Sequence, residues 1–202
     1  NIDTLVSILV DSGHSKLVLK SDDEPAIIAL WNAAQAIAKG THRIDVVPET
    51  SPVGDSQSNG LVENAVKEIK GVARTLRHCL CELHNVEVPH GHPVLTWLVQ
   101  HAAGCSNRGQ LGPDGQTAYF RWKGRPFKRS LPPFGEMVEF LPARKRQTST
   151  IGDRWLAGVY LGVVEKSSEL IIGFGEKVVK ARCVRRRTMS ERANSEALLK
   201  IQ

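Results

Sequence analysis

The feature that most constrains the fold is a long stretch of helical periodicity that begins near Ser58. Apolar residues recur there at intervals of three and four, which is the spacing of a helix with one buried face. They are Val62, Ala65 or Val66, Ile69, Val72 or Ala73, Leu76, Leu80 and Leu83. Ser58 or Asn59 can cap the first turn. The pattern predicts a helix of several turns that packs against a core.

A stripe of charged residues follows the same helix. Glu63 stands in the expected first turn, and the cations Lys67, Lys70, Arg74 and Arg77 follow it at helical intervals. A carboxylate near a helix N-terminus is stabilised by the helix dipole. A row of cations can lie along a phosphate backbone. The alternative is a solvated helix face in which Glu63 and Lys67 form an ion pair one turn apart.

The residues before this helix predict an alternation of helices and strands. The expected elements are a helix at 2–9, a buried strand at 17–19, a helix at 25–39 ended by Gly40, a strand at 44–47 ended by Pro48, and a polar loop at 49–58. Such alternation is typical of α/β proteins. Asp22 comes directly after the first strand, where ligands of α/β sheets usually bind.

The residues after the long helix predict a change of architecture. A helix at 94–103 precedes a glycine-rich linker at 107–116 and a basic, aromatic stretch at 117–133 that proline breaks too often for regular structure. Short β patterns follow at 137–141, 155–164, 170–174 and 177–184, and predict a small barrel or sheet. The last one runs into Arg185, Arg186 and Arg187. We expect a core at 1–107, a basic linker at 108–133, a barrel-like module at 134–188 and a tail at 189–202.

Charge is unevenly distributed along the chain. Residues 1–60 carry eight acids and four bases, whereas residues 61–202 carry 23 bases and 13 acids, in agreement with the net charge of +6. A basic C-terminal part that follows an acid-bearing N-terminal part predicts a polyanionic partner. No apolar run approaches the roughly 20 residues that span a bilayer, so no membrane span is expected.

The four cysteines form no paired secretory framework and predict reduced thiols in an intracellular protein. His78, Cys79, Cys81 and His84 have the residue types of a zinc site. However, Cys79 and Cys81 are two residues apart on a helix and point to different faces, which favours buried or half-buried thiols.

Asp22 and Glu63 together are the minimum for holding Mg²⁺ or Mn²⁺ against a phosphate, because hard divalent ions prefer carboxylate oxygens. A pair of such ions can activate an attacking hydroxyl and stabilise the leaving oxygen in phosphoryl transfer. The alternative is two solvated surface acids.

The first part of the chain is expected to run in the order strand, Ser21-Asp22-Asp23, helix, strand, polar loop and Gln57-Ser58-Asn59-Gly60-Leu61-Val62-Glu63. This order resembles the catalytic core of retroviral and copia-like retrotransposon integrases. These are the DD(E) enzymes of the ribonuclease H-like fold. Phe134-Gly135 and the run 158–162 resemble the segment after the core in copia-type polyproteins. The resemblance implies a partial ribonuclease H-like core, without its opening strands, followed by a small all-β module.

The resemblance also assigns roles to individual residues. Asp22 falls on the family's second catalytic aspartate and Glu63 on its glutamate, so both are expected to be catalytic and to bind Mg²⁺ or Mn²⁺. Lys67 and Lys70 fall where retroviral integrases have lysines that touch the viral DNA end. The full set of expected nucleic-acid-binding residues is Gln57, Asn59, Lys67, Lys70, Arg74, Arg185, Arg186 and Arg187.

Two departures from the family pattern matter. The spacing from Asp22 to Glu63 is a handful of residues longer than usual, and we place the extra residues in the loop at 49–55. The family's first catalytic aspartate, its opening strand and its N-terminal zinc-binding domain have no counterpart, because Asp3 and Asp11 lie on a predicted helix. The expectation is therefore an N-terminally truncated fragment or a degenerate copy that binds metal weakly.

The resemblance implies that the parent protein carries out metal-dependent DNA 3′-end processing and strand transfer. Its expected partners are retroelement DNA ends, target DNA and further copies of the chain, without a membrane, and its place of action is the nucleus. Whether this chain is itself an enzyme stays open. The alternatives are a non-catalytic nucleic-acid-binding module or an inactive relic, and, less favoured by the run at 57–63, a related nuclease. The arginine run could equally be a solvated strand end.

Overall fold

The computed structural model describes residues 2–21, 24–50, 60–142 and 154–202. The chain divides into two compact units, residues 1–66 and residues 67–202. It is a mixed α/β structure that contains a closed four-stranded antiparallel barrel. The predicted ribonuclease H-like core and the predicted domain boundaries stay predictions.

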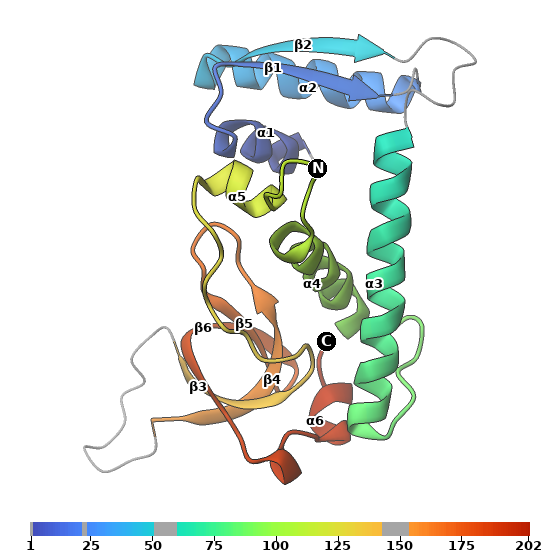
Figure 1. Cartoon of the computed structure of the whole chain (residues 1–202), viewed down its shortest axis with the longest axis vertical. Helices are drawn as coiled ribbons and strands as arrows, with labels where there is room; N and C mark the ends of the chain where they lie inside the picture. The colour runs from blue at the N-terminus through green and yellow to red at the C-terminus, as the bar shows by residue number, and fades with distance from the viewer. Residues whose placement is uncertain (1, 22–23, 51–59, 143–153) are drawn as a thin grey trace. The chain divides into compact units, whose positions relative to one another are not determined.

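The first unit is built around a strand–helix–strand crossover (Figure 1). Its elements are α1 Ile2–Asp11, β1 Lys16–Ser21, α2 Pro25–His42 and β2 Asp45–Thr50. β1 and β2 pair in parallel, with Leu17 opposite Val46. α1 and α2 pack on the face of this sheet that carries Leu17 and Leu19, and their buried contact residues include Leu9 and Ala38. The predicted order of helices and strands is confirmed in the described residues.

Three sequence expectations in this unit are wrong. α2 does not stop at Gly40 but continues to His42, where Arg43 takes a left-handed conformation (φ 57°) and ends the helix. β1 is not buried on both faces, since Val18 is 57% exposed. β2 passes through Pro48, because among the described residues it pairs with β1 alone and an edge strand tolerates proline.

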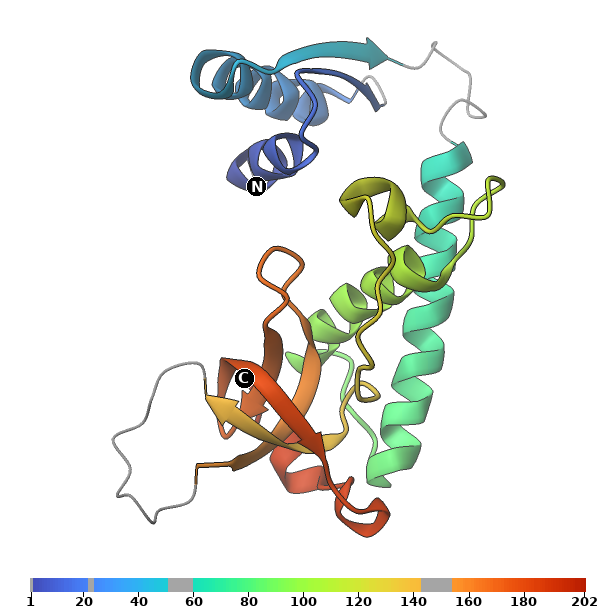
Figure 2. The same ribbon diagram turned by 60° about the vertical axis from the view of Figure 1, so that its left-hand side comes forward.

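The second unit combines helices with the barrel (Figure 2). Its elements are α3 Gly60–His84, α4 Val94–Gly109, α5 Ala118–Lys123, β3 Met137–Pro142, β4 Leu156–Val163, β5 Leu170–Phe174, β6 Lys177–Arg186, the 3₁₀-helix η2 Met189–Glu191 and α6 Ser195–Leu199. The first residues of α3, up to Val66, are counted with the first unit. The strands pair in chain order, and pairing of β3 with β6 closes the barrel. The four predicted β segments are thereby confirmed.

The barrel is small enough that side chains fill it completely. Its buried interior consists of Val138, Phe140, Tyr160, Leu170, Ile172 and Ala181. Gly158 makes this packing possible. A Cβ at that position would lie 2.5 Å from Cγ2 of Ile172 and 2.8 Å from the carbonyl oxygen of Gly173. A larger residue would force β4 and β5 apart.

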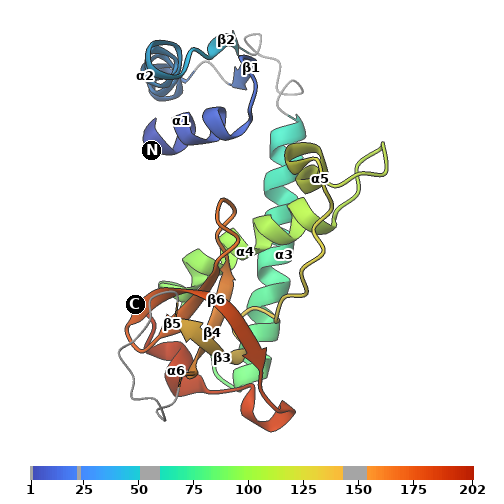
Figure 3. The same cartoon turned by 90° about the vertical axis from the view of Figure 1, so that its left-hand side faces the viewer.

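A second core lies outside the barrel, against the C-terminal half of α3, α4 and α6 (Figure 3). β4 contributes Val159 and Leu161 to this core and Tyr160 to the barrel interior, so the strand is buried on both faces. Leu80 of α3 is 1% exposed. Gly135 allows this close approach, because a Cβ there would lie 2.1 Å from Cδ1 of Leu80.

The structure corrects three expectations in this unit. α4 runs to Gly109, so the start of the expected linker is helical. The stretch at 117–133 contains the regular helix α5, because Thr117 caps it and Gly124 closes it. Finally, α3 is not buried along its whole apolar stripe. The tail at 189–202 joins the second core through its buried residues Leu198 and Ile201.

Burial of α3 is confined to its C-terminal half. Leu80 is almost fully buried, whereas Val62 and Val66 are 64% and 43% exposed. Leu83 is also 36% exposed. The helical period was predicted correctly, but Val62, Val66 and Leu83 of the predicted apolar face are exposed.

Candidate nucleic-acid interface

The described site residues lie mainly on one face of α3. Glu63 occupies the first turn and is exposed. Lys67, Lys70 and Arg74 are also exposed and follow at four, seven and eleven residues, which places them on the same face because an α-helix has 3.6 residues per turn. Glu63 and Lys67, which both belong to the described residues, form no ion pair. The alternative interpretation, a solvated helix face held by a Glu63–Lys67 ion pair, therefore lacks its defining contact. We define Lys67, Lys70 and Arg74 as the cationic face.

The other charged groups of α3 are engaged elsewhere. Glu68, on a different side of the helix, accepts a hydrogen bond from Nε2 of Gln110 at 3.0 Å. Arg77, the last cation of the predicted stripe, donates from Nη2 to the carbonyl oxygen of Val88 at 2.9 Å. Within the described part of the chain, no ion pair is found for a residue of the cationic face. Its charge therefore remains available to a polyanion.

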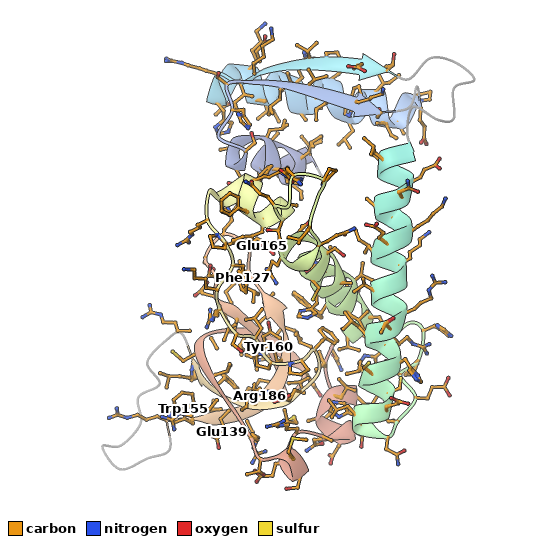
Figure 4. All side chains as sticks on the ribbon, in the orientation of Figure 1. Phe127, Glu139, Trp155, Tyr160, Glu165 and Arg186 are labelled. Atoms are coloured by element: carbon orange, nitrogen blue, oxygen red, sulfur yellow. The ribbon has the colours of Figure 1, made fainter. Side chains whose placement is uncertain are left out.

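The three arginines at the end of β6 have three different environments. The Arg185 guanidinium lies over the ring of Trp155, 3.9 Å from its centroid. Arg186 donates from Nε and Nη2 to the two carboxylate oxygens of Glu136 at 2.8 and 2.6 Å. Arg187 is half-buried and pairs with Glu191 at 3.4 Å. Figure 4 labels Trp155 and Arg186 on the barrel.

Glu136 is the residue that the sequence prediction missed. It is 2% exposed and binds Arg186 in a bidentate manner, and the Arg192 guanidinium lies 3.5 Å away. The ion pair with Glu136 raises the pKa of Arg186 further. The sequence feature that could have revealed Glu136 is the presence of an acidic residue within the apolar run at 134–138. Arg186 thus has a structural contact, while Arg185 keeps its charge at the surface.

Three of the expected site residues, Asp22, Gln57 and Asn59, lie outside the described residues. Pairing of Asp22 with Glu63 around a metal ion therefore stays a prediction. In the described ranges, no group of three or more His, Cys, Asp and Glu side chains could hold a metal ion.

The residues of the considered zinc site have other partners. His78 pairs with Glu82 at 3.2 Å. His84 is buried between the carbonyl oxygen of Gly135 and the backbone N–H of Asn194. All four cysteines are free thiols. Cys81 is half-buried, as expected, whereas Cys79 was expected to be buried or half-buried and is exposed.

One of the solved structures that match this chain is a viral assembly, and the likeness to it is distant. No family model and no curated protein matches the chain. A chain in the cryo-EM structure of the simian T-cell lymphotropic virus intasome in complex with PP2A regulatory subunit B56 gamma matches 93% of this chain, at 14% identity and a TM-score of 0.40. The match spans 63% of that chain. The likeness is too distant to establish a shared fold, and membership of the integrase family stays a prediction.

Among the helices of the described residues, none is both long and apolar enough to cross a bilayer.

Proposed function

We propose that this chain is part of a retroelement-type integrase and that it binds the DNA backbone through the cationic face of α3. The observation that carries the proposal is the arrangement on α3. An exposed acid in the first turn is followed on the same helix face by three exposed cations. The run Gln57 to Glu63 at the head of this helix is the sequence that most resembles integrases.

The spacing of the cationic face suits a nucleic-acid backbone. Lys67, Lys70 and Arg74 are separated by about 4.5 and 6 Å along the helix axis, at a rise of about 1.5 Å per residue. One DNA strand carries a phosphate for about every 3.4 Å of its axis. Long lysine and arginine side chains can therefore reach neighbouring phosphates while the helix stays rigid.

The proposal extends to the chemistry of the parent protein, which is DNA 3′-end processing and strand transfer into target DNA in the nucleus. Glu63 supplies the hard oxygen donor that Mg²⁺ or Mn²⁺ prefers, and its exposed position fits this role. With Asp22 it would hold the metal, which supplies an activated hydroxyl and neutralises charge at the phosphate. Lys67 and Lys70, one and two turns away, would position the DNA end. Further copies of the chain are the expected assembly partners.

The DNA-binding part is tested with the variant Lys67→Gln, Lys70→Gln, Arg74→Gln. At 0.1 M salt its affinity for a 20-base-pair duplex should fall about a hundredfold, and the slope of log K against log salt should become shallower by about 2 to 3, because each released counterion contributes roughly 0.9. Fluorescence anisotropy over a salt series measures both quantities.

The matched control removes the same charge from other surfaces. The exposed residues Lys16, Lys39 and Lys200 are replaced by glutamine in one variant. It should keep most of the affinity and of the slope. Equal losses in the two variants would mean that net charge alone matters, and the cationic face would not be the DNA site.

The metal-binding part is tested by calorimetric titration of Mn²⁺ into the full chain and into Glu63→Gln. Saturable binding that weakens at least tenfold in the variant is expected, because a carboxylate ligand becomes a neutral amide. Binding that is absent, or equal in both proteins, would contradict the metal site. The alternative function, a non-catalytic nucleic-acid-binding module, would then account for the cationic face.

A further inference from the structure

α5 is a short helix whose two ends are both fixed. Oγ1 of Thr117 accepts a hydrogen bond from the backbone N–H of Phe120 at 3.1 Å. Gly124, at φ 66°, closes the other end by donating to the carbonyl oxygen of Phe120 at 2.8 Å. α5 lies beside the C-terminal end of α4 (Figure 3). Its side chains therefore project from a rigid support.

The segment after α5 is anchored as firmly. Phe127 packs edge-on against Tyr119, with ring centroids 5.3 Å apart. The Arg108 guanidinium lies 4.8 Å from the centroid of the same Phe127 ring and pairs with Glu165; Figure 4 labels Phe127 and Glu165. Arg129 donates to the carbonyl oxygens of Ser168 and Arg182. The aromatic rings on this side thus serve packing.

The ring of Trp122 is largely left out of this packing. Trp122 is 46% exposed, whereas Trp31 is buried and Trp97 and Trp155 are half-buried. Nearly half of this large aromatic side chain lies in water. That exposed apolar surface does not contribute the free energy that its burial would supply. The Trp122 ring is therefore available to a partner.

The charged residues that follow Trp122 in the sequence indicate the kind of partner. Lys123, Arg125 and Lys128 are exposed and have no ion pair within the described part of the chain. The nearby acid, Asp114, is occupied by Arg121, whose Nε and Nη2 lie 2.9 and 2.7 Å from its carboxylate oxygens. That contact also holds the pKa of Asp114 low, at about 2. The exposed ring is thus accompanied by uncompensated positive charge.

We infer that Trp122, with Lys123 and Arg125, binds single-stranded nucleic acid by stacking on one unpaired base while the cations contact the adjacent phosphates. A base inside a duplex is already stacked on its neighbours, so the exposed ring selects an unpaired nucleotide. This site goes beyond the proposed function, because it lies on α5 instead of α3 and recognises a different form of nucleic acid.

The test measures binding of the full chain to labelled dT15 and to a 20-base-pair duplex. Trp122→Ala should weaken dT15 binding about five- to a hundredfold, which is the range for loss of one base–aromatic stack. Trp122→Phe keeps an aromatic face and should stay within about threefold of the wild type. Duplex binding should be unchanged in both variants, and dT15 should quench less tryptophan fluorescence in Trp122→Phe than in the wild type.

Leu111→Ala is the matched control, because Leu111 is an exposed apolar side chain (65%) in the preceding segment. It should bind dT15 like the wild type. Unchanged dT15 binding in Trp122→Ala, or the same loss for the duplex or in Leu111→Ala, would overturn the inference. Failure of the cationic face of α3 would show itself differently, as duplex binding that falls equally in the α3 variant and in its Lys16, Lys39 and Lys200 control, whatever Trp122→Ala does to dT15 binding.

Discussion

Replacing Arg186 with alanine should lower the free energy of unfolding by about 1–3 kcal/mol, the range for a buried acceptor that is left without its hydrogen-bond donor. The change leaves the carboxylate of Glu136, which is 2% exposed, without its bidentate partner. Arg192, 3.5 Å from Glu136, compensates part of the charge. Urea unfolding followed by circular dichroism, together with hydrogen exchange of the barrel amides, measures the loss.

Arg185→Ala is the matched control for Arg186. It removes a neighbouring arginine whose side chain lies on Trp155 at the surface, and it should cost less than about 1 kcal/mol. The double variant Arg186→Ala, Glu136→Met should recover much of the lost stability, because it no longer buries a carboxylate. Equal stability of Arg185→Ala and Arg186→Ala would contradict the structural role of the pair.

The free energy of unfolding should fall by at most about 3 kcal/mol between pH 6.5 and pH 4 because of His101, at about 1.4 kcal/mol per pKa unit. Burial, and to a lesser degree the Arg108 charge, lower the pKa of His101 to about 4. The unfolded chain takes up the proton near pH 6.5 and the folded chain resists it, so acidification favours unfolding. Burial lowers the pKa of His84 as well, which adds in the same direction.

His101→Phe isolates this contribution. The ring of His101 lies 5.3 Å from that of Phe134 and 5.9 Å from that of Tyr160, and its buried Nδ1 has no hydrogen-bond partner in the described structure. A phenylalanine fits this aromatic surrounding and does not titrate. Urea unfolding at pH 7, 6 and 5 should therefore show a shallower loss in the variant. The same loss in both proteins would mean that other groups cause it.

Local patterns were sufficient for the elements of the fold. The alternation of helices and strands in the first unit, the long helix α3 and the four strands of the barrel follow from periodicity and from turn residues. The errors lie where a local rule has an exception, as with Pro48 inside β2 and the capped helix α5. The residues of the cationic face were also predictable, because their helical spacing is a local property.

The amino-acid sequence by itself determined the order of elements, the uneven charge and the helix that carries Glu63 with the cationic face. Only the tertiary structure decided which charges remain available. Arg185 and Arg186 are adjacent in sequence, but Arg186 meets Glu136, fifty residues earlier, and Arg185 does not. Likewise, apolar residues recur along the whole length of α3, yet Leu80 is buried and Val62 is exposed. Burial and ion pairing depend on contacts between distant segments, and local periodicity does not encode those contacts.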